Sequence, residues 1–266
     1  MKRNIAALLA LAALAFVATG CKMLKARDNL GQGVKLFKNT QYSQAVEKFE
    51  EAVRLDPSFP TARVYLAMAY YMQYIPGAES PENQQMADHA LSEFQKVLEQ
   101  DPKNDIATKY IATLYNTQKK FDEATTWFKK AVELNPKDKE AYYTLGVIAW
   151  SKWYPVYGTA RAKLGMKVDE PGPIKDKKVK EELKTQYLPV INEGISDLEK
   201  ALEIDKEYDD AMAYMNLLVR ERADLDDTPD DYKKDIETAD NWVQKTLQTK
   251  KIKAERKPTS TGITAQ

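Results

Sequence analysis

Apolar residues return along much of the chain at the spacing of amphipathic helices. Ala45, Phe49, Ala52 and Val53 stand at positions i, i+4, i+7 and i+8, which places them on one helical face. Three such stretches end just before a proline, which stops a helix at little cost: Pro57, Pro102 and Pro136. No segment alternates apolar and polar residues with a period of two, so the pattern predicts an all-α protein.

The helical stretches repeat. The pattern Ala-x3-Phe-x2-Ala/Val-x4-Pro begins at Ala45, Ala90 and Ala124. Pro102 and Pro136 are 34 residues apart, and Pro57 and Pro102 are 45 apart, which is 34 plus an insertion of 11. Because one helix pair cannot bury its apolar face alone, repetition of this kind predicts stacked helix pairs.

These spaced positions resemble tetratricopeptide repeats. The terminal proline is counted as position 32 of the repeat. On this numbering position 8 holds a small residue in the first three repeats and in a weaker fourth one: Gly33, Ala67, Ala112 and Gly146. In that family a small residue there lets the first helix of a repeat approach the second. The resemblance implies an all-α, tetratricopeptide-like, right-handed α-solenoid of helix hairpins, with a long insertion in the fourth repeat.

The repeat arithmetic predicts five units between residues 26 and 250. They lie near 26–59, 60–104, 105–138, 139–208 and 209–250, and the fifth is degenerate. The fourth contains the insertion at about 151–193, and a long helix is expected from Asp176 to Ile204 with a kink at Pro189. Residues 251–266 are expected to form a disordered basic and polar tail.

The first twenty residues read as an export signal. Lys2 and Arg3 precede thirteen apolar residues, Ile5 to Val17, a run that is short for a membrane span. Ala18-Thr-Gly-Cys21 resembles the lipobox of bacterial lipoproteins, which implies removal of residues 1–20 and lipidation of Cys21, with residues 21–25 as a short tether. The alternative is ordinary cleavage after Gly20, which leaves a free thiol. In Gram-negative lipoproteins an aspartate directly after the cysteine acts as an inner-membrane retention signal. This chain has Lys22 there, so the resemblance favours the periplasmic face of the outer membrane.

Composition narrows the chemistry. Lys plus Arg and Asp plus Glu each number 40, and this balance argues against nucleic acid as a partner. One Cys and one His exclude an internal disulfide and a multi-ligand zinc site. No cofactor or metal is expected. The acidic run from Asp224 to Asp231 lacks the spacing of a helix–loop–helix calcium site and fits the start of a helix at Pro229.

No catalytic grouping is evident, since His89 is expected on a helix surface. The resemblance instead implies a ligand groove lined by the first helices, which maps onto Val64, Met68, Tyr71, Met72, Lys109, Thr113, Asn116, Tyr143, Val147, Trp150, Leu217 and Arg220. The expected ligand is an extended or helical peptide of another envelope protein, and the oligomeric state is left open. Membrane contact is expected through the N-terminal lipid.

The 151–193 insertion carries a second cluster of aromatic residues, Trp153, Tyr154 and Tyr157. Two interpretations remain: a binding element that presents these rings to a partner, or a brace that covers the repeats. Together these features favour a lipid-anchored scaffold in an envelope assembly such as outer-membrane biogenesis, pilus or secretion machinery, or cell-wall synthesis. The alternative is an enzyme or small-ligand binder with a site between the insertion and the groove, near Asp169 and Glu170.

Overall fold

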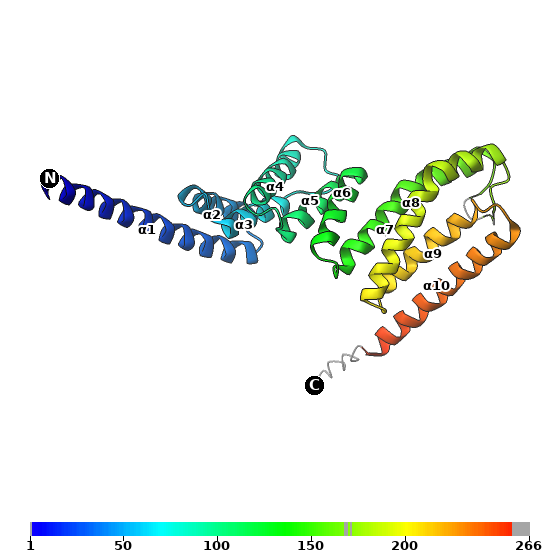
Figure 1. Ribbon diagram of the computed structural model, residues 1–266. Helices are drawn as coiled ribbons and strands as arrows, with labels where there is room; N and C mark the ends of the chain where they lie inside the picture. The colour runs from blue at the N-terminus through cyan, green and yellow to red at the C-terminus, as the bar shows by residue number, and fades with distance from the viewer. Residues whose placement is uncertain (1, 168–169, 171, 257–266) are drawn as a thin grey trace, which may run out of the picture. The chain divides into compact units, whose positions relative to one another are not determined.

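The computed structural model describes residues 2–167, 170 and 172–256. Over these residues the chain is helical and contains no strand, as the periodicity predicts. Figure 1 shows the helices in chain order: α1 (Lys2–Lys38), α2 (Tyr42–Leu55), α3 (Pro60–Tyr71), α4 (Pro81–Gln100), α5 (Asp105–Thr117), α6 (Phe121–Leu134), α7 (Lys139–Lys163), α8 (Lys177–Ile204), α9 (Asp209–Ala223) and α10 (Pro229–Arg256).

The helices form two compact units, Met1–Trp127 and Phe128–Gln266, and the division falls within α6. In the N-terminal unit α1 packs against α2, α2 against α3, α3 against α4 and α4 against α5. Aromatic residues form part of its core: Phe49 and Phe94 are fully buried, and Trp127 is partly buried against the same cluster. In the C-terminal unit Phe128 is buried as well.

The small residues at position 8 have the packing role that the repeat pattern implies. A Cβ atom on Gly33 of α1 would overlap the ring of Phe49 on α2, and a Cβ atom on Gly146 of α7 would overlap Leu198 on α8. Ala67 and Ala112 are fully buried at the same position. The first and second helices of these pairs therefore approach so closely that only a small side chain fits.

The 11 extra residues of the second repeat lengthen its second helix and the turn before it. α4 has 20 residues, whereas α2 and α6 have 14 each. Ser80 caps α4, because its side chain accepts a hydrogen bond from the backbone N–H of Asn83. Asn83 holds the preceding turn: it accepts from the N–H of Ile75 at 2.7 Å and donates to the carbonyl oxygens of Ile75 and Ala78, both at 2.8 Å.

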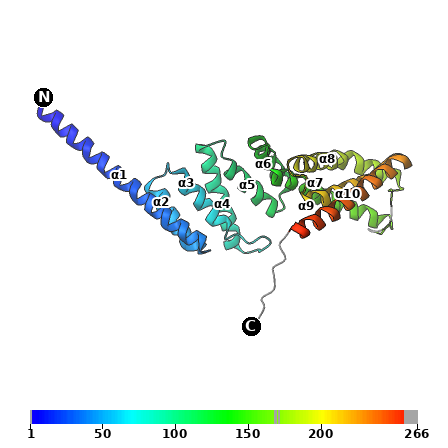
Figure 2. The same cartoon turned by 90° about the horizontal axis from the view of Figure 1, so that it is seen from below.

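The insertion of the fourth repeat is built mainly from extensions of two helices. α7 continues to Lys163 and α8 starts at Lys177, so the two helices of this repeat have 25 and 28 residues. Figures 1 and 2 both show α7 and α8 side by side along their lengths. α9 packs against both of them, and α10 packs against α9. Trp153 and Leu218 lie in the fully buried core between these helices.

Both ends of the repeat region differ from the sequence prediction. Residues 21–25, predicted as a short tether, are helical and belong to α1, and no proline interrupts the helix between Lys2 and Lys38. Residues 20–25 are exposed, whereas Ala26 is fully buried. At the other end α10 continues to Arg256, so residues 251–256 are helical; the predicted tail beyond them lies outside the described residues. None of the helices, over the residues described, is long and apolar enough to cross a membrane.

Candidate protein-binding surfaces

In the N-terminal unit the predicted groove residues lie on α3 and α5. Val64, Met68 and Tyr71 are partly buried, and Met72, which caps the end of α3, is 43% exposed. The ring of Tyr71 meets that of Tyr110 edge to face, with centroids 5.1 Å apart. These positions combine apolar contact area with access to solvent, which a peptide-binding surface requires.

The α5 positions are more polar. Lys109, Thr113 and Asn116 are all partly exposed. The hydroxyl of Thr113 donates to the backbone carbonyl of Lys109 at 2.8 Å, so it satisfies itself within its own helix.

In the C-terminal unit five aromatic side chains form a continuous series, here called the aromatic row: Tyr208, Tyr143, Tyr214, Trp150 and Tyr154. Along the row successive ring centroids are 5.0, 5.7, 5.6 and 4.7 Å apart. The first four rings are partly exposed, and Tyr154 is 37% exposed. The row therefore gives α7 and the start of α9 a joined aromatic surface that water still reaches.

Sequence reasoning found only part of this row. It placed Tyr143 and Trp150 in the groove and assigned Tyr154 to the insertion, but it missed Tyr208 and Tyr214. The repeat register of the degenerate fifth unit points to neighbouring positions instead. A signal was present, since two tyrosines six residues apart bracket the start of that unit's first helix.

The other groove residues of this unit are partly exposed but differ in availability. Val147 and Leu217 present apolar surface. The guanidinium of Arg220 is occupied: it donates to Asp240 of α10 at 2.5 Å and to Asn216 of its own helix at 3.1 and 3.2 Å. Arg220 therefore links α9 to α10, and its guanidinium is already engaged.

Trp153 and Tyr157 are buried, so they do not form an exposed anchor with Tyr154. Trp153 is 0% exposed and packs against the rings of Tyr157 and Tyr187. The hydroxyl of Tyr157 donates to Oδ2 of Asp224 at 2.8 Å. For these two residues the structure favours the brace over the binding element, because their rings fill the space between the extended helices.

An ionic network holds the end of the insertion to the turn between α9 and α10. Arg161, which is 1% exposed, pairs with Asp224 and donates to the backbone carbonyl of Lys167 at 2.8 Å. Burial raises the pKa of Asp224, while the hydroxyl of Tyr157 and the Arg161 guanidinium oppose that rise. Burying a charge costs free energy unless the opposite charge and the hydrogen-bond partners are in place. Removal of either Arg161 or Asp224 would therefore leave the other as an uncompensated buried charge.

A second buried carboxylate lies beneath the aromatic row. Glu221 of α9 is 7% exposed, and its Oε1 accepts a hydrogen bond from the indole N–H of Trp150 at 3.0 Å. Within the described residues, its Oε2 and the indole nitrogen of Trp153 are both buried without a hydrogen-bond partner. Loss of hydration raises the pKa of Glu221 to about 7, against the lowering effect of the Trp150 hydrogen bond, although the nearby Trp153 N–H also lowers this pKa.

The acidic run before α10 is engaged in structural contacts. Asp227 pairs with Lys184 of α8, and Thr228 caps α10 by accepting from the N–H of Asp231 at 3.1 Å. Within the described residues no three His, Cys, Asp or Glu side chains are grouped to hold a metal ion. His89 is exposed on α4, where its ring stacks on that of Tyr70. Asp169, named with Glu170 for the alternative small-ligand site, lies outside the described residues.

Comparison with known proteins supports the repeat assignment. Two tetratricopeptide-repeat family models match, one over residues 33–73 and the other over 84–147. The human mitochondrial import receptor subunit TOM70 is 22% identical over 204 residues, which are 77% of this chain but 27% of that protein. The chain thus spans about a quarter of the length of this relative.

Solved structures agree on the fold. A MamA structure from Desulfovibrio magneticus RS-1 matches with a TM-score of 0.56 and 17% identity, over 85% of this chain and 96% of that one. YrrB, described as a TPR protein with an unusual peptide-binding site, matches with a TM-score of 0.51 and 16% identity, over 84% and 90% of the two chains. The predicted all-α, tetratricopeptide-like α-solenoid fold is therefore confirmed, and it supports a scaffold for protein–protein interactions.

Proposed function

We propose that this protein is a lipid-anchored scaffold of the bacterial cell envelope that holds an extended or helical segment of a partner protein against the aromatic row. The aromatic row carries the proposal. It joins five rings, each in contact with the next, on α7 and at the start of α9, and it leaves every one of them partly exposed. Tyr and Trp are the residues on which binding energy concentrates at protein interfaces.

The charges beside the row suit a peptide rather than a reacting substrate. Arg220 is already paired, and the carboxyl group of Glu221 is covered by Trp150. The tetratricopeptide fold is generally a non-catalytic interaction module, and the rings of Trp153 and Tyr157 in the insertion are buried in the core. YrrB, with the same fold, is described as having a peptide-binding site, which supports the class of ligand proposed here.

The envelope location rests on the N-terminal sequence. Cys21 is the only cysteine of the chain, it is exposed, and it follows the short apolar run after a lipobox-like sequence. Because residues 21–25 are helical, the five residues that join the lipid to the first packed residue, Ala26, would span about 7 Å rather than about 17 Å. Such an anchor would hold the repeats close to the periplasmic face of the outer membrane.

The anchor and the groove need separate tests. Metabolic labelling with a radioactive or clickable fatty acid, in a bacterial host, should label the wild-type protein and not Cys21→Ser. The variant should also leave the membrane fraction. Equal labelling of both proteins, or a soluble wild type, would remove the lipid anchor from the proposal and leave the scaffold untouched.

The groove is tested by crosslinking in native membranes followed by identification of the recovered proteins. Tyr154→Ala combined with Tyr214→Ala should lose specific partners, while Tyr232→Ala, a tyrosine on α10 outside the row, should keep them. Trp150→Ala is a poorer choice, because it leaves the buried carboxyl group of Glu221 without its donor. Recovery of the same partners by the double variant, at equal helical content, would contradict the assignment of the row.

A further inference from the structure

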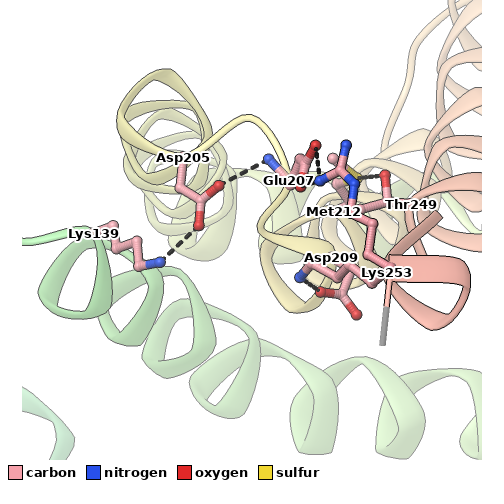
Figure 3. Close-up of polar contacts among 8 residues, drawn as sticks. Lys139, Asp205, Glu207, Asp209, Met212, Thr249 and Lys253 are labelled. Carbon is pink, nitrogen blue, oxygen red and sulfur yellow. Dashed lines mark hydrogen bonds and ion pairs between the residues drawn. The ribbon is translucent and has the colours of Figure 1, made fainter. Parts of the chain in front are cut away.

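A second surface of the C-terminal unit lies between α8 and α10, and it is lined by residues other than those of the aromatic row, whose first ring, Tyr208, belongs to the adjoining turn. One end of this surface is the turn between α8 and α9, which ion pairs hold in position. Three acidic side chains of this turn and of the start of α9 each pair with a base from another helix, as Figure 3 shows for two of the pairs. The pairs are Asp205–Lys139, Glu207–Arg256 and Asp209–Lys253.

Beside this turn an open groove of about 370 Å³ runs along α10. Leu202 of α8 and Met212 of α9 contribute its deepest surface, and both are buried. Trp242 and Ile252 of α10 add partly exposed apolar walls. The hydroxyl of Thr249 donates to the sulfur of Met212 at 3.6 Å, which ties α10 to the groove floor (Figure 3).

The rim of the groove is positively charged. Lys206 and Lys245 line it, both are exposed, and neither has an ion-pair partner within the described residues. The ammonium group of Lys245 lies 4.1 Å from the ring centroid of Trp242, so it stands over the groove wall. The acids of the adjoining turn and of the start of α9 are paired with other bases: Asp205 with Lys139, Glu207 with Arg256 and Asp209 with Lys253.

We propose that this groove binds an acidic amphipathic segment of a partner protein. Apolar side chains of the segment would occupy the space above Leu202 and Met212, and flanking carboxylates would meet Lys206 and Lys245. Trp242 and Ile252 are ten residues apart on one helix, a separation of about 15 Å, which matches about three helical turns of a docked segment. The site is separate from the aromatic row, so the scaffold has two docking surfaces.

A protein segment fits the charges of α10 better than an anionic membrane does. The first half of the helix exposes Asp230, Asp231, Glu237 and Asp240, which an anionic bilayer would repel. Only the second half of the helix is basic. A ligand as long as the groove would contact only the part of α10 from Trp242 to Ile252, where the charged lining residue is Lys245. A flat bilayer would contact the whole helix, including its acidic first half.

The test uses fluorescence anisotropy with two labelled twelve-residue peptides on the full exported chain, residues 21–266. Both peptides carry leucines at helical spacing; one is flanked by glutamates and the other by lysines. The glutamate peptide should bind the wild type, and Lys206→Glu with Lys245→Glu should weaken binding by about tenfold and favour the lysine peptide instead. Lys233→Glu with Lys234→Glu, outside the groove on the same helix, is the matched control and should bind like the wild type.

Three results would overturn the proposal: no binding of the glutamate peptide, equal binding by the groove variant, or equal weakening by the control variant. Circular dichroism and the thermal midpoint show that each variant is folded. Vesicles with phosphatidylglycerol form a separate arm, and vesicle binding that the groove variant alone abolishes, without peptide binding, would assign the groove to lipid. Tyr154→Ala with Tyr214→Ala should retain the peptide, which separates this site from the aromatic row.

Discussion

The buried carboxyl group of Glu221 makes the stability of the C-terminal unit depend on pH. Its pKa is about 7 in the folded protein, raised first by loss of hydration, against 4.5 as the ordinary value. A folded-state pKa above the unfolded one means that the folded protein holds the proton more tightly. The stabilisation is therefore complete below about pH 4.5, falls as the pH rises, and is lost above about pH 7.

The magnitude follows from the two pKa values. Between pH 5 and pH 8 the linkage relation gives a loss of about 2.5 kcal/mol from this one group. Glu221→Gln cannot ionise and keeps an oxygen that can accept from Trp150. The amide has its own cost or gain, but that offset does not change with pH. The wild-type unfolding free energy should thus fall relative to that of the variant by about 2.5 kcal/mol over this range.

Urea unfolding followed by tryptophan fluorescence is the suitable assay. Three of the four tryptophans, Trp150, Trp153 and Trp242, lie in the C-terminal unit, so the signal reports mainly on the unit that contains Glu221. Burial also raises the pKa of Asp197 to about 7 and that of Asp226 to about 6, so the wild type alone is not diagnostic. Comparison with Glu221→Gln cancels their contributions. A constant difference between the two proteins from pH 5 to pH 8 would refute the reasoning.

Three further changes test the packing. Arg161→Met should cost about 3–5 kcal/mol in urea unfolding, because it leaves Asp224 charged and buried, and a loss below 1 kcal/mol would contradict the role of the pair. Gly146→Val should lower stability by at least about 1–3 kcal/mol, since its side chain would overlap that of the facing α8 helix; an unchanged thermal midpoint would mean that the helices are farther apart. Asn83→Ala should speed hydrogen exchange at the amide of Ile75, and exchange as slow as in the wild type would show that the turn does not need the Asn83 side chain.

Local sequence signals predicted most of the helices correctly. Helix ends are marked by the prolines at 57, 102 and 136. The starts of α4 and α10 are marked by Ser80–Pro81 and Thr228–Pro229, in which a capping hydroxyl precedes a proline. The small residues at position 8 predicted where helices pack closely, because close packing permits only Gly or Ala there and the same position is small in repeat after repeat. Errors occurred where no such trace exists, as at residues 21–25 and 251–256, which continue neighbouring helices.

The long-range contacts could not be read from the sequence. Arg161 and Asp224 are separated by 63 positions, and nothing near either residue indicates its partner. The same holds for Trp150 and Glu221, which are 71 positions apart. The contacts depend on how far the extended helices reach and how α9 lies against them. Tyr214 was missed for a related reason, since in a degenerate repeat a shift of one residue changes which side chain faces the groove.

The two interpretations of the insertion apply to different faces of one helix. In α7 the spacing of Tyr143, Trp150 and Tyr154 keeps their rings on the accessible side, where Tyr154 extends the row beyond a helix of ordinary repeat length. Trp153 follows Trp150 by three residues, and Tyr157 follows Tyr154 by three. Each is thus turned by about 60° around the helix from its predecessor, and both are buried against α8 and α9. A long exposed helix face is stable only if its other side is well packed. The buried rings and the Arg161–Asp224 pair supply that packing, so the insertion can brace the unit and lengthen its candidate binding surface at once.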